Sequence, residues 1–185
     1  VERFLPRLLE GDARGAIQLV DPALASNDDL KRFYTELIHP CMYEIGRLWE
    51  LGRITVAHEH LATATVERIL SILYPRFIVT DSSCGQALVA ASINEYHQLG
   101  ARMVADMSEL AGWDVDFLGA NTPMDDLLQM LRAKPYRWLG LSVTMSFNIA
   151  GLEQVIRAIR EDAELAPLKI MLGGYLFQLS PSSLS

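Results

Sequence analysis

Hydrophobic positions in the first 78 residues recur every three to four places, the spacing of an α-helix that buries one face. The polar run at 26–29 combines Ser and acidic residues in the way that favours a helix start. Thr55 begins a second, longer helix, and Gly52 ends the helix before it. Because no strand-like pattern interrupts this part, we expect a helical bundle of the four-helix type over residues 1–78.

From Gln86 onward, short apolar runs of strand length alternate with stretches of helical periodicity. The expected strands cover 87–92, 114–118, 138–143 and 169–172. The expected helices cover about 100–111, 124–133 and 148–162. This alternation predicts a parallel sheet with crossover helices over 86–185, joined to the bundle by a short linker at 79–85. Doubly wound domains commonly have five strands or more, so we expect the C-terminal edge of the sheet to be truncated in this chain.

Composition narrows the class of protein. Half of the 185 residues are hydrophobic, which predicts a well-filled core, and the formal net charge is -7. Without a dense Lys/Arg patch, direct nucleic-acid binding by this chain is not expected. No apolar run reaches membrane-spanning length. Cys41 and Cys84 lack metal-type spacing and fit free thiols in a reducing compartment, so we expect a cytoplasmic protein. No signal peptide is visible, but the chain starts at Val1, which leaves open whether residues precede it.

The loop after the first expected strand carries candidate chemistry, the motif Glu95-x-His97-x-x-Gly100. In an open α/β sheet, ligands bind in the crevice outside the carboxyl ends of the strands. An imidazole there can offer one nitrogen to a metal while a carboxylate holds the other N–H. Taken alone, the motif also fits an ordinary strand-to-helix loop whose histidine caps a helix or faces solvent.

Two further loops are expected at the same edge of the sheet. The third strand ends in Ser142-Val143-Thr144, and the fourth ends in the pair Gly173-Gly174. Small and hydroxyl-bearing residues let a bulky ligand approach the backbone closely and hydrogen-bond to it. The glycine pair is a weak signal by itself, since glycines are common at strand ends.

Together these three loops resemble the Rossmann-like (flavodoxin-like) cobalamin-binding domain of corrinoid proteins. The family pattern is Asp-x-His-x-x-Gly, then Ser-x-Leu, then Gly-Gly; here Glu95 replaces the Asp and Thr144 the Leu. The resemblance implies that His97 is the lower axial ligand of cobalt, displacing the cofactor's dimethylbenzimidazole, with Glu95 steadying the imidazole. It also implies a slot for the displaced nucleotide tail, lined by Ser142, Val143, Thr144, Gly173 and Gly174.

The helical half holds a second pattern, Trp49 followed after nine residues by Glu59-His60. By itself this fits a helix end, a turn and a charged helix start, with the tryptophan in the core. The pattern closely resembles the bundle of light-sensing, cobalamin-dependent transcriptional regulators of the MerR type. That resemblance implies that the bundle covers the upper face of the corrin. Trp49, Glu59 and His60 then line the chamber of an adenosyl or methyl group.

One departure concerns the residue after the tryptophan, which is a histidine in the best-known light regulators and Glu50 here. A bis-histidine photoproduct through that position is therefore excluded, and His39, His58 and His60 stay open as substitutes. Some relatives also bind a linear tetrapyrrole such as biliverdin, and the sequence does not decide this. A zinc site at 58–60 is not favoured, because helix positions two apart point to different sides.

From the resemblance we expect a cobalamin-binding sensory domain, not an enzyme, that responds to light. It would use alkylcobalamin photolysis to change its conformation or oligomeric state and so regulate an output such as transcription. We also expect a homo-oligomer with an output module or partner of unknown kind. The alternative is a corrinoid methyl carrier that serves a methyltransferase, and a third option is a cobalamin store or chaperone. Illumination of the loaded protein distinguishes the first two.

Overall fold

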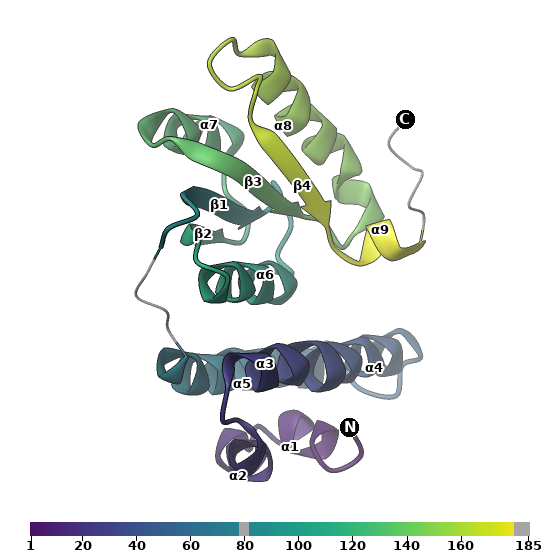
Figure 1. The fold of residues 1–185 in the computed structure, drawn as a ribbon. Helices are drawn as coiled ribbons and strands as arrows, with labels where there is room; N and C mark the ends of the chain where they lie inside the picture. The colour runs from purple at the N-terminus through teal and green to yellow at the C-terminus, as the bar shows by residue number, and fades with distance from the viewer. Residues whose placement is uncertain (78–81, 180–185) are drawn as a thin grey trace. The chain divides into compact units, whose positions relative to one another are not determined.

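The computed structural model describes residues 1–77 and 82–179, which fall into two units divided between Ile78 and Val79 (Figure 1). The first unit is helical, and the second contains a sheet with helices. The expected linker at 79–85 lies partly outside the described residues. Each unit is described on its own below.

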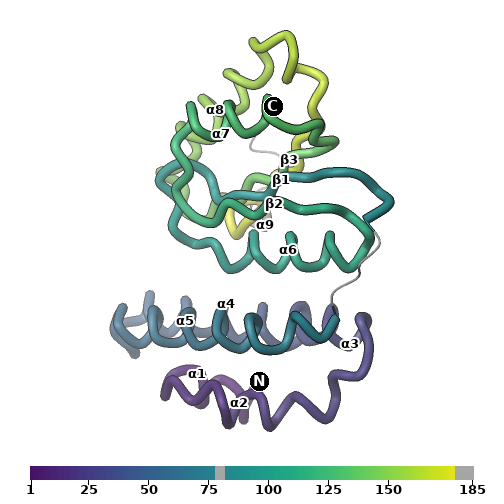
Figure 2. Tube along the Cα trace, turned by 90° about the vertical axis from the view of Figure 1, so that its left-hand side faces the viewer, coloured from purple at the N-terminus to yellow at the C-terminus, as the bar shows by residue number. Residues whose placement is uncertain are grey.

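The helical unit consists of four consecutive helical rods. The elements are α1 (Leu5–Leu9), α2 (Ala13–Val20), a 3₁₀ turn (Asp21–Ala23), α3 (Asn27–Arg32), a π-helix (Phe33–Ile38), α4 (His39–Glu50), α5 (Val56–Leu73) and a second 3₁₀ turn (Tyr74–Arg76). From α3 to α4 the chain stays helical without a break, so these segments form one rod. Figure 2 shows α4 and α5 side by side, and α1 and α2 pack against α5. The expected bundle is confirmed.

Local hydrogen bonds explain where these helices begin and end. The Ser26 hydroxyl accepts the backbone N–H of Asp29 at 3.2 Å, and the Asp29 carboxylate accepts the N–H of Ser26 at 3.0 Å, a capping box. At the start of α5, the ring nitrogen Nδ1 of His58 lies 3.3 Å from the backbone nitrogen of Thr55. Gly52, with φ +65°, donates its N–H to the carbonyl of Trp49 at 2.8 Å and so ends α4.

The bundle buries an apolar core that its helical periodicity predicts. Fully buried side chains come from each of the four rods: Leu8, Ala16, Leu30, Tyr34, Ile38, Cys41, Ile45, Val66, Ile69 and Leu70. Burial raises the pKa of the Cys41 thiol, which keeps it protonated and unreactive at neutral pH. Cys41 is therefore a small core residue of the bundle.

The second unit contains a four-stranded parallel sheet with the strand order β2-β1-β3-β4. The strands are β1 (Gln86–Ala91), β2 (Asp114–Gly119), β3 (Tyr136–Ser142) and β4 (Lys169–Gly173). This order is that of the flavodoxin-like doubly wound fold, in which the chain reverses direction between β1 and β3. The expected fold class is confirmed. The loops that follow β1 and β3 start at the switch point where such folds bind ligands.

Helices cover both faces of this sheet. They are α6 (Leu99–Leu110), α7 (Met124–Ala133), α8 (Ile149–Glu161) and α9 (Tyr175–Leu179), with a 3₁₀ turn (Ser146–Asn148) before α8. In Figure 1, α6 lies along one face, and α7 and α8 lie along the other. Alternate residues of β1 serve the two faces: Val89 packs with α6, whereas Leu88 and Ala90 join the larger cluster under α7 and α8.

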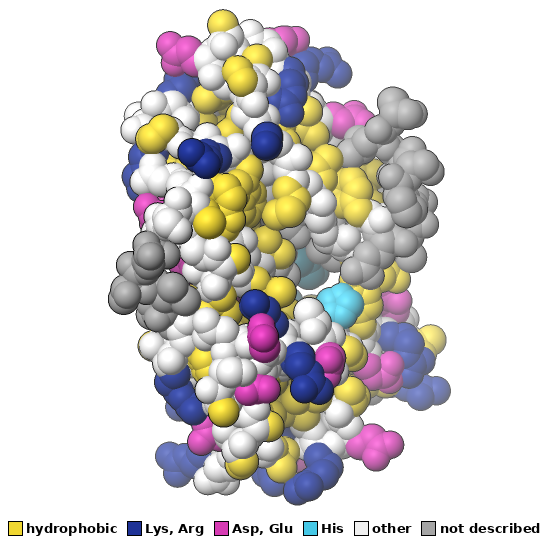
Figure 3. All heavy atoms as spheres, in the orientation of Figure 1, with side chains coloured by type: hydrophobic (Ala, Val, Ile, Leu, Met, Phe, Trp, Pro, Cys, Tyr) yellow, Lys and Arg dark blue, Asp and Glu magenta, His cyan; other side chains and the backbone are white. Residues whose placement is uncertain are grey.

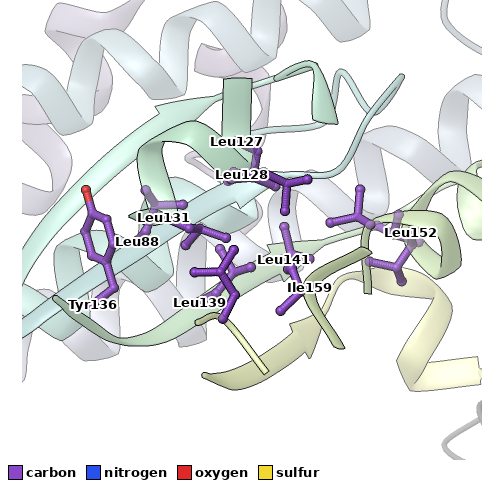
Figure 4. Close-up of a cluster of buried hydrophobic side chains, with 13 residues drawn as sticks. Leu88, Leu127, Leu128, Leu131, Tyr136, Leu139, Leu141, Leu152 and Ile159 are labelled. Carbon is purple, nitrogen blue, oxygen red and sulfur yellow. The ribbon is translucent and has the colours of Figure 1, made fainter. Parts of the chain in front are cut away.

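The larger cluster is the main core of this unit, and its side chains come from β1, β3, α7 and α8 (Figure 4). Its labelled members are Leu88, Leu127, Leu128, Leu131, Tyr136, Leu139, Leu141, Leu152 and Ile159. Each of them is at most 9% exposed. At about 25 cal/mol per Å² of apolar surface removed from water, such a cluster dominates the stability of the unit. It holds the carboxyl ends of β1 and β3 rigidly beside each other.

The surface carries mixed charge. On the face drawn in Figure 3, Lys and Arg side chains are interspersed with Asp and Glu side chains. Within residues 1–77 and 82–179, no helix is both long enough and apolar enough to cross a membrane.

Candidate functional site

Glu95, in the loop after β1, is a fully buried carboxylate with 0% exposure. Its Oε2 accepts hydrogen bonds from the backbone amides of Thr144 at 2.8 Å and Met145 at 3.1 Å, and from Asn148 Nδ2 at 3.1 Å. Its Oε1 accepts the backbone N–H of His97 at 3.0 Å and lies 2.5 Å from the ring nitrogen Nδ1 of His97. The carboxylate therefore ties the loop after β1 to the loop after β3.

These hydrogen bonds decide the charge of Glu95. Burial raises the pKa of the carboxyl group, but the bonds from the His97 ring and from the backbone amides of His97, Met145 and Thr144 outweigh it and lower the pKa to about 2. At neutral pH the group is a carboxylate that is permanently available to a ring N–H.

His97 is the exposed member of the pair, with 52% of its side chain accessible. Because Nδ1 faces a carboxylate that is an acceptor only, the proton of a neutral ring is expected on Nδ1. The nitrogen that such a ring presents to a metal is then Nε2. A carboxylate behind a histidine ligand fixes the orientation of the ring and raises its basicity. The geometry fits an axial histidine ligand.

Three asparagines shape this loop, and the sequence pattern did not identify them. Asn94 and Asn121 adopt φ values of 60° and 52°, a region that asparagine tolerates better than most residues. The backbone N–H of Asn94 donates to Asn121 Oδ1 at 3.0 Å. Asn148, 5% exposed, also donates to the carbonyl of Asn94 at 3.2 Å. An asparagine before a helix predicts a cap, which is why Asn148 gave no separate signal.

The glycines of the motifs differ in what they do. A Cβ at Gly100 or at Gly173 would meet no heavy atom within 4 Å, so neither glycine is required by packing inside the protein. At Gly174, where φ is +109°, a Cβ would lie 2.0 Å from the carbonyl oxygen of Val143. Gly174 is therefore required by the fold, whereas open space remains beside Gly100, in the first turn of α6, and beside Gly173, at the end of β4. This space fits the close approach of a bulky group.

The residues at the end of β3 face different surroundings. Ser142 pairs with Ala91 and Gly173 in the sheet, so three small residues form the last row of the strands. The side chain of Val143 is fully buried in the core under α7 and α8, and its N–H donates to the carbonyl of Gly173 at 2.9 Å. Thr144 contributes its backbone amide to Glu95.

The residues expected over the upper face lie in the helical unit. Trp49, near the C-terminal end of α4, is 44% exposed and so is not a core residue. In the first turns of α5, Glu59 Oε2 lies 2.5 Å from His60 Nδ1, and Glu59 Oε1 accepts the Thr63 hydroxyl at 2.9 Å. The neighbouring His58 is bound to Thr55. Over the described parts of the chain, no group of three or more His, Cys, Asp or Glu side chains is arranged to hold a metal ion.

Comparison with known protein families identifies both units. A family model described as a B12 binding domain matches residues 85–185, and a second model with the same description matches residues 1–74. The chain belongs to the B12-binding family. It is a cobalamin-binding protein, as the resemblance of its motifs implied.

Relatives of this B12-binding chain fall into two functional groups. It is 29% identical over 157 residues to the HTH-type transcriptional repressor CarH of Myxococcus xanthus, a match that covers 84% of this chain and 51% of CarH. It is 26% identical over 137 residues to dimethylamine corrinoid protein 1 of Methanosarcina acetivorans, covering 72% of this chain and 63% of the relative. The chain thus spans about half of one relative and less than two thirds of the other. These similarities favour neither group.

A solved structure agrees with the fold of this B12-binding chain. The monomethylamine corrinoid protein of Methanosarcina barkeri matches with a TM-score of 0.79 at 17% identity, over 94% of this chain and 84% of that protein. At this identity the similarity establishes the fold.

Proposed function

We propose that this B12-binding protein is a light-responsive cobalamin sensor in which His97 is the lower axial ligand. The observation that carries the proposal is the pair formed by the buried Glu95 carboxylate and the half-exposed His97 ring. The pair lies at the switch point of a doubly wound sheet, the usual ligand position in this fold. His97 Nε2 binds the cobalt, and Glu95 holds the ring in position through Nδ1.

The neighbouring strand ends accommodate the rest of the lower face. Gly100 and Gly173 provide the open space already described, which favours the close approach of the cofactor. Ser142, Thr144, Gly173 and Gly174, at the ends of β3 and β4, would hold the displaced nucleotide tail. The Val143 side chain supports this slot from the core side of the sheet.

The upper chamber, formed by Trp49, Glu59 and His60, is the part of the proposal that distinguishes a sensor from a methyl carrier. Trp49 presents a large exposed aromatic surface, which packs over the upper axial group. Glu59, held by Thr63 and His60, offers a fixed carboxylate to the same group. A bound alkylcobalamin, adenosyl or methyl, supplies a weak cobalt–carbon bond that visible light breaks. Trp49 and Glu59 would lose their contacts together with that group, and this change would bias the conformation or oligomeric state of the protein.

The second candidate function is a methyl carrier for a corrinoid methyltransferase. The similarity to dimethylamine corrinoid protein 1 supports it to the same degree as the similarity to CarH supports a sensor. The lower site is the same in both functions. In a carrier, the helical unit must move aside so that a partner enzyme reaches the metal.

The deciding experiment loads the protein with adenosylcobalamin in the dark and records its absorption spectrum and sedimentation before and after green light. A sensor is expected to show a spectral change and a change in oligomeric state. The His97→Ala variant is expected to lose the dark spectrum of the histidine-ligated form. A spectrum and a sedimentation profile unaffected by light, together with methyl transfer to a thiol or folate acceptor, would rule out the sensor. An unaltered spectrum in His97→Ala would rule out the ligand.

A further inference from the structure

Three of the four strands are followed, at the carboxyl edge of the sheet, by a segment with one exposed aromatic side chain. Tyr96 precedes His97 and is 70% exposed, Phe147 follows β3 and is 73% exposed, and Tyr175 follows Gly174 and is 38% exposed. Across residues 82–179, the other large hydrophobic side chains that are exposed are Val104 on α6 and Met171 on β4. The exposed aromatic residues of this unit therefore gather at one edge.

A single exposed aromatic residue needs no explanation, but a group at one edge indicates a binding surface. Each of the three is adjacent in sequence to a residue of the candidate site. Tyr96 adjoins His97, and its hydroxyl lies 3.3 Å from Asn121 Nδ2, in the loop that braces Asn94. Phe147 adjoins Asn148, which donates to Glu95 at 3.1 Å. Tyr175 adjoins Gly174, whose close approach to Val143 fixes the start of α9.

The proposed ligation by His97 determines what covers these side chains. A histidine nitrogen binds a first-row transition metal at about 2 Å, so the plane of the macrocycle lies only that far beyond Nε2. The corrin ring is far wider than this separation. A corrin held by His97 must therefore extend over neighbouring segments at this edge of the sheet, the edge to which Tyr96, Phe147 and Tyr175 belong.

We propose that Tyr96, Phe147 and Tyr175 form an aromatic ledge that contacts the lower face and rim of the corrin macrocycle. This inference rests on the corrinoid-binding part of the proposed function and is independent of the response to light. The ledge binds the macrocycle itself, so it serves corrinoids with or without a nucleotide tail. Broad aromatic side chains contribute binding through apolar contact area, and they also limit the tilt of the ring on its axial ligand.

The test measures corrinoid affinity in the full chain by absorbance titration with aquacobinamide, which has no nucleotide tail, and with hydroxocobalamin. Tyr96→Ser and Phe147→Ser are each expected to raise Kd about tenfold for both corrinoids, the effect of about 1.4 kcal/mol of lost contact. Phe147→Leu keeps part of the apolar surface, so its Kd is expected to fall between those of the wild type and Phe147→Ser. Val104→Ser is the matched control, since it removes a 38% exposed side chain on α6, and its Kd is expected to stay at the wild-type value.

The outcomes separate this inference from the function on which it rests. If Tyr96→Ser and Phe147→Ser bind both corrinoids like wild type while His97→Ala loses binding, the ledge is disproved and the ligand stands. If wild-type protein binds neither corrinoid, the proposed function fails and the ledge with it. A second copy of the chain is the competing occupant. An apo dimer that Phe147→Ser converts to monomer, with unchanged Kd, would overturn the proposal in its favour.

Discussion

At the scale of single residues, Gly173 and Gly174 are neighbours with opposite requirements. Gly174→Ala is expected to destabilise the sheet unit by about 3 kcal/mol, because it combines an unfavourable φ with a clash against backbone that cannot move aside. Gly173→Ala is expected to change stability by less than about 0.5 kcal/mol, since its Cβ meets nothing. It is nevertheless expected to weaken corrinoid binding. Urea denaturation and corrinoid titration of both variants measure this. Wild-type affinity in Gly173→Ala would place the ligand elsewhere.

Some of the individual site residues can be identified from the sequence, and others cannot. Glu95 and His97 were identified because a carboxylate and an imidazole two residues apart have a recognisable chemistry. Asn148 was not, because its partners are the carboxylate and carbonyl of residues 53 and 54 positions away. Val143, just after β3, is buried in the core under α7 and α8, and no motif encodes that burial.

At the scale of elements, hydrophobic pattern and caps predicted β1–β4, α6, α7 and α8 to within two residues at each boundary, whereas α9 (Tyr175–Leu179) was not predicted. The largest difference is at β3, which begins at Tyr136 rather than Trp138. Tyr136 is 9% exposed and its hydroxyl donates a hydrogen bond to the Asp116 carboxylate. That contact joins strands 20 residues apart in sequence, beyond the reach of local pattern. The π-helix at 33–38 was missed for a related reason, since apolar spacing does not reveal a change of hydrogen-bond register.

The hydrogen bonds to Asp116, between β2 and β3, also make the stability of the sheet unit depend on pH. Its Oδ2 accepts hydrogen bonds from Lys134 Nζ at 2.6 Å and from the Tyr136 hydroxyl. Burial raises the pKa of Asp116, but these bonds outweigh it and lower the pKa below 3.8. A folded-state pKa below the unfolded one adds stability that is present above pH ~4 and is lost as pH falls through the folded value. Asp116→Asn is therefore expected to cost about 1 kcal/mol at pH 7 and much less near pH 2.

Urea denaturation at the two pH values tests this expectation. Glu164→Gln removes an exposed carboxylate near the α8–β4 connection and is the control. A loss of stability in Asp116→Asn that is equal at both pH values would show that the carboxylate acts through packing alone.

At the scale of the whole molecule, the two halves of the proposed site come from different units. His97 belongs to the sheet, and Trp49 belongs to the bundle. The chemistry of Glu95 and His97 identified the lower half, but only family resemblance connected it with Trp49, because local physics gives no reason to link Trp49 with a loop 48 residues later. Two B12-binding family models, one for each unit, support the view that both units serve the same cofactor.

This division predicts that substitutions in the two units affect the binding of adenosylcobalamin and hydroxocobalamin differently. If Trp49 contacts only the upper axial group, Trp49→Ala should raise Kd for adenosylcobalamin about tenfold and leave hydroxocobalamin, which lacks the bulky group, unchanged. Because Trp49 is 44% exposed, its removal is expected to cost the bundle little stability. Leu51→Ala, at a 55% exposed position just after α4, is the matched control. His97→Ala should weaken the binding of both ligands equally.

The double variant Trp49→Ala/His97→Ala tests whether the two residues contribute independently to binding. If Trp49 and His97 act on opposite faces of the ligand, as proposed, their effects on adenosylcobalamin binding should add to within about 0.5 kcal/mol. Equal losses for both ligands in Trp49→Ala would mean that the tryptophan supports the corrin as a whole and does not respond to the upper group. The loss of that group would then leave the contacts of Trp49 unchanged, and the bundle would have no way to register illumination through this residue.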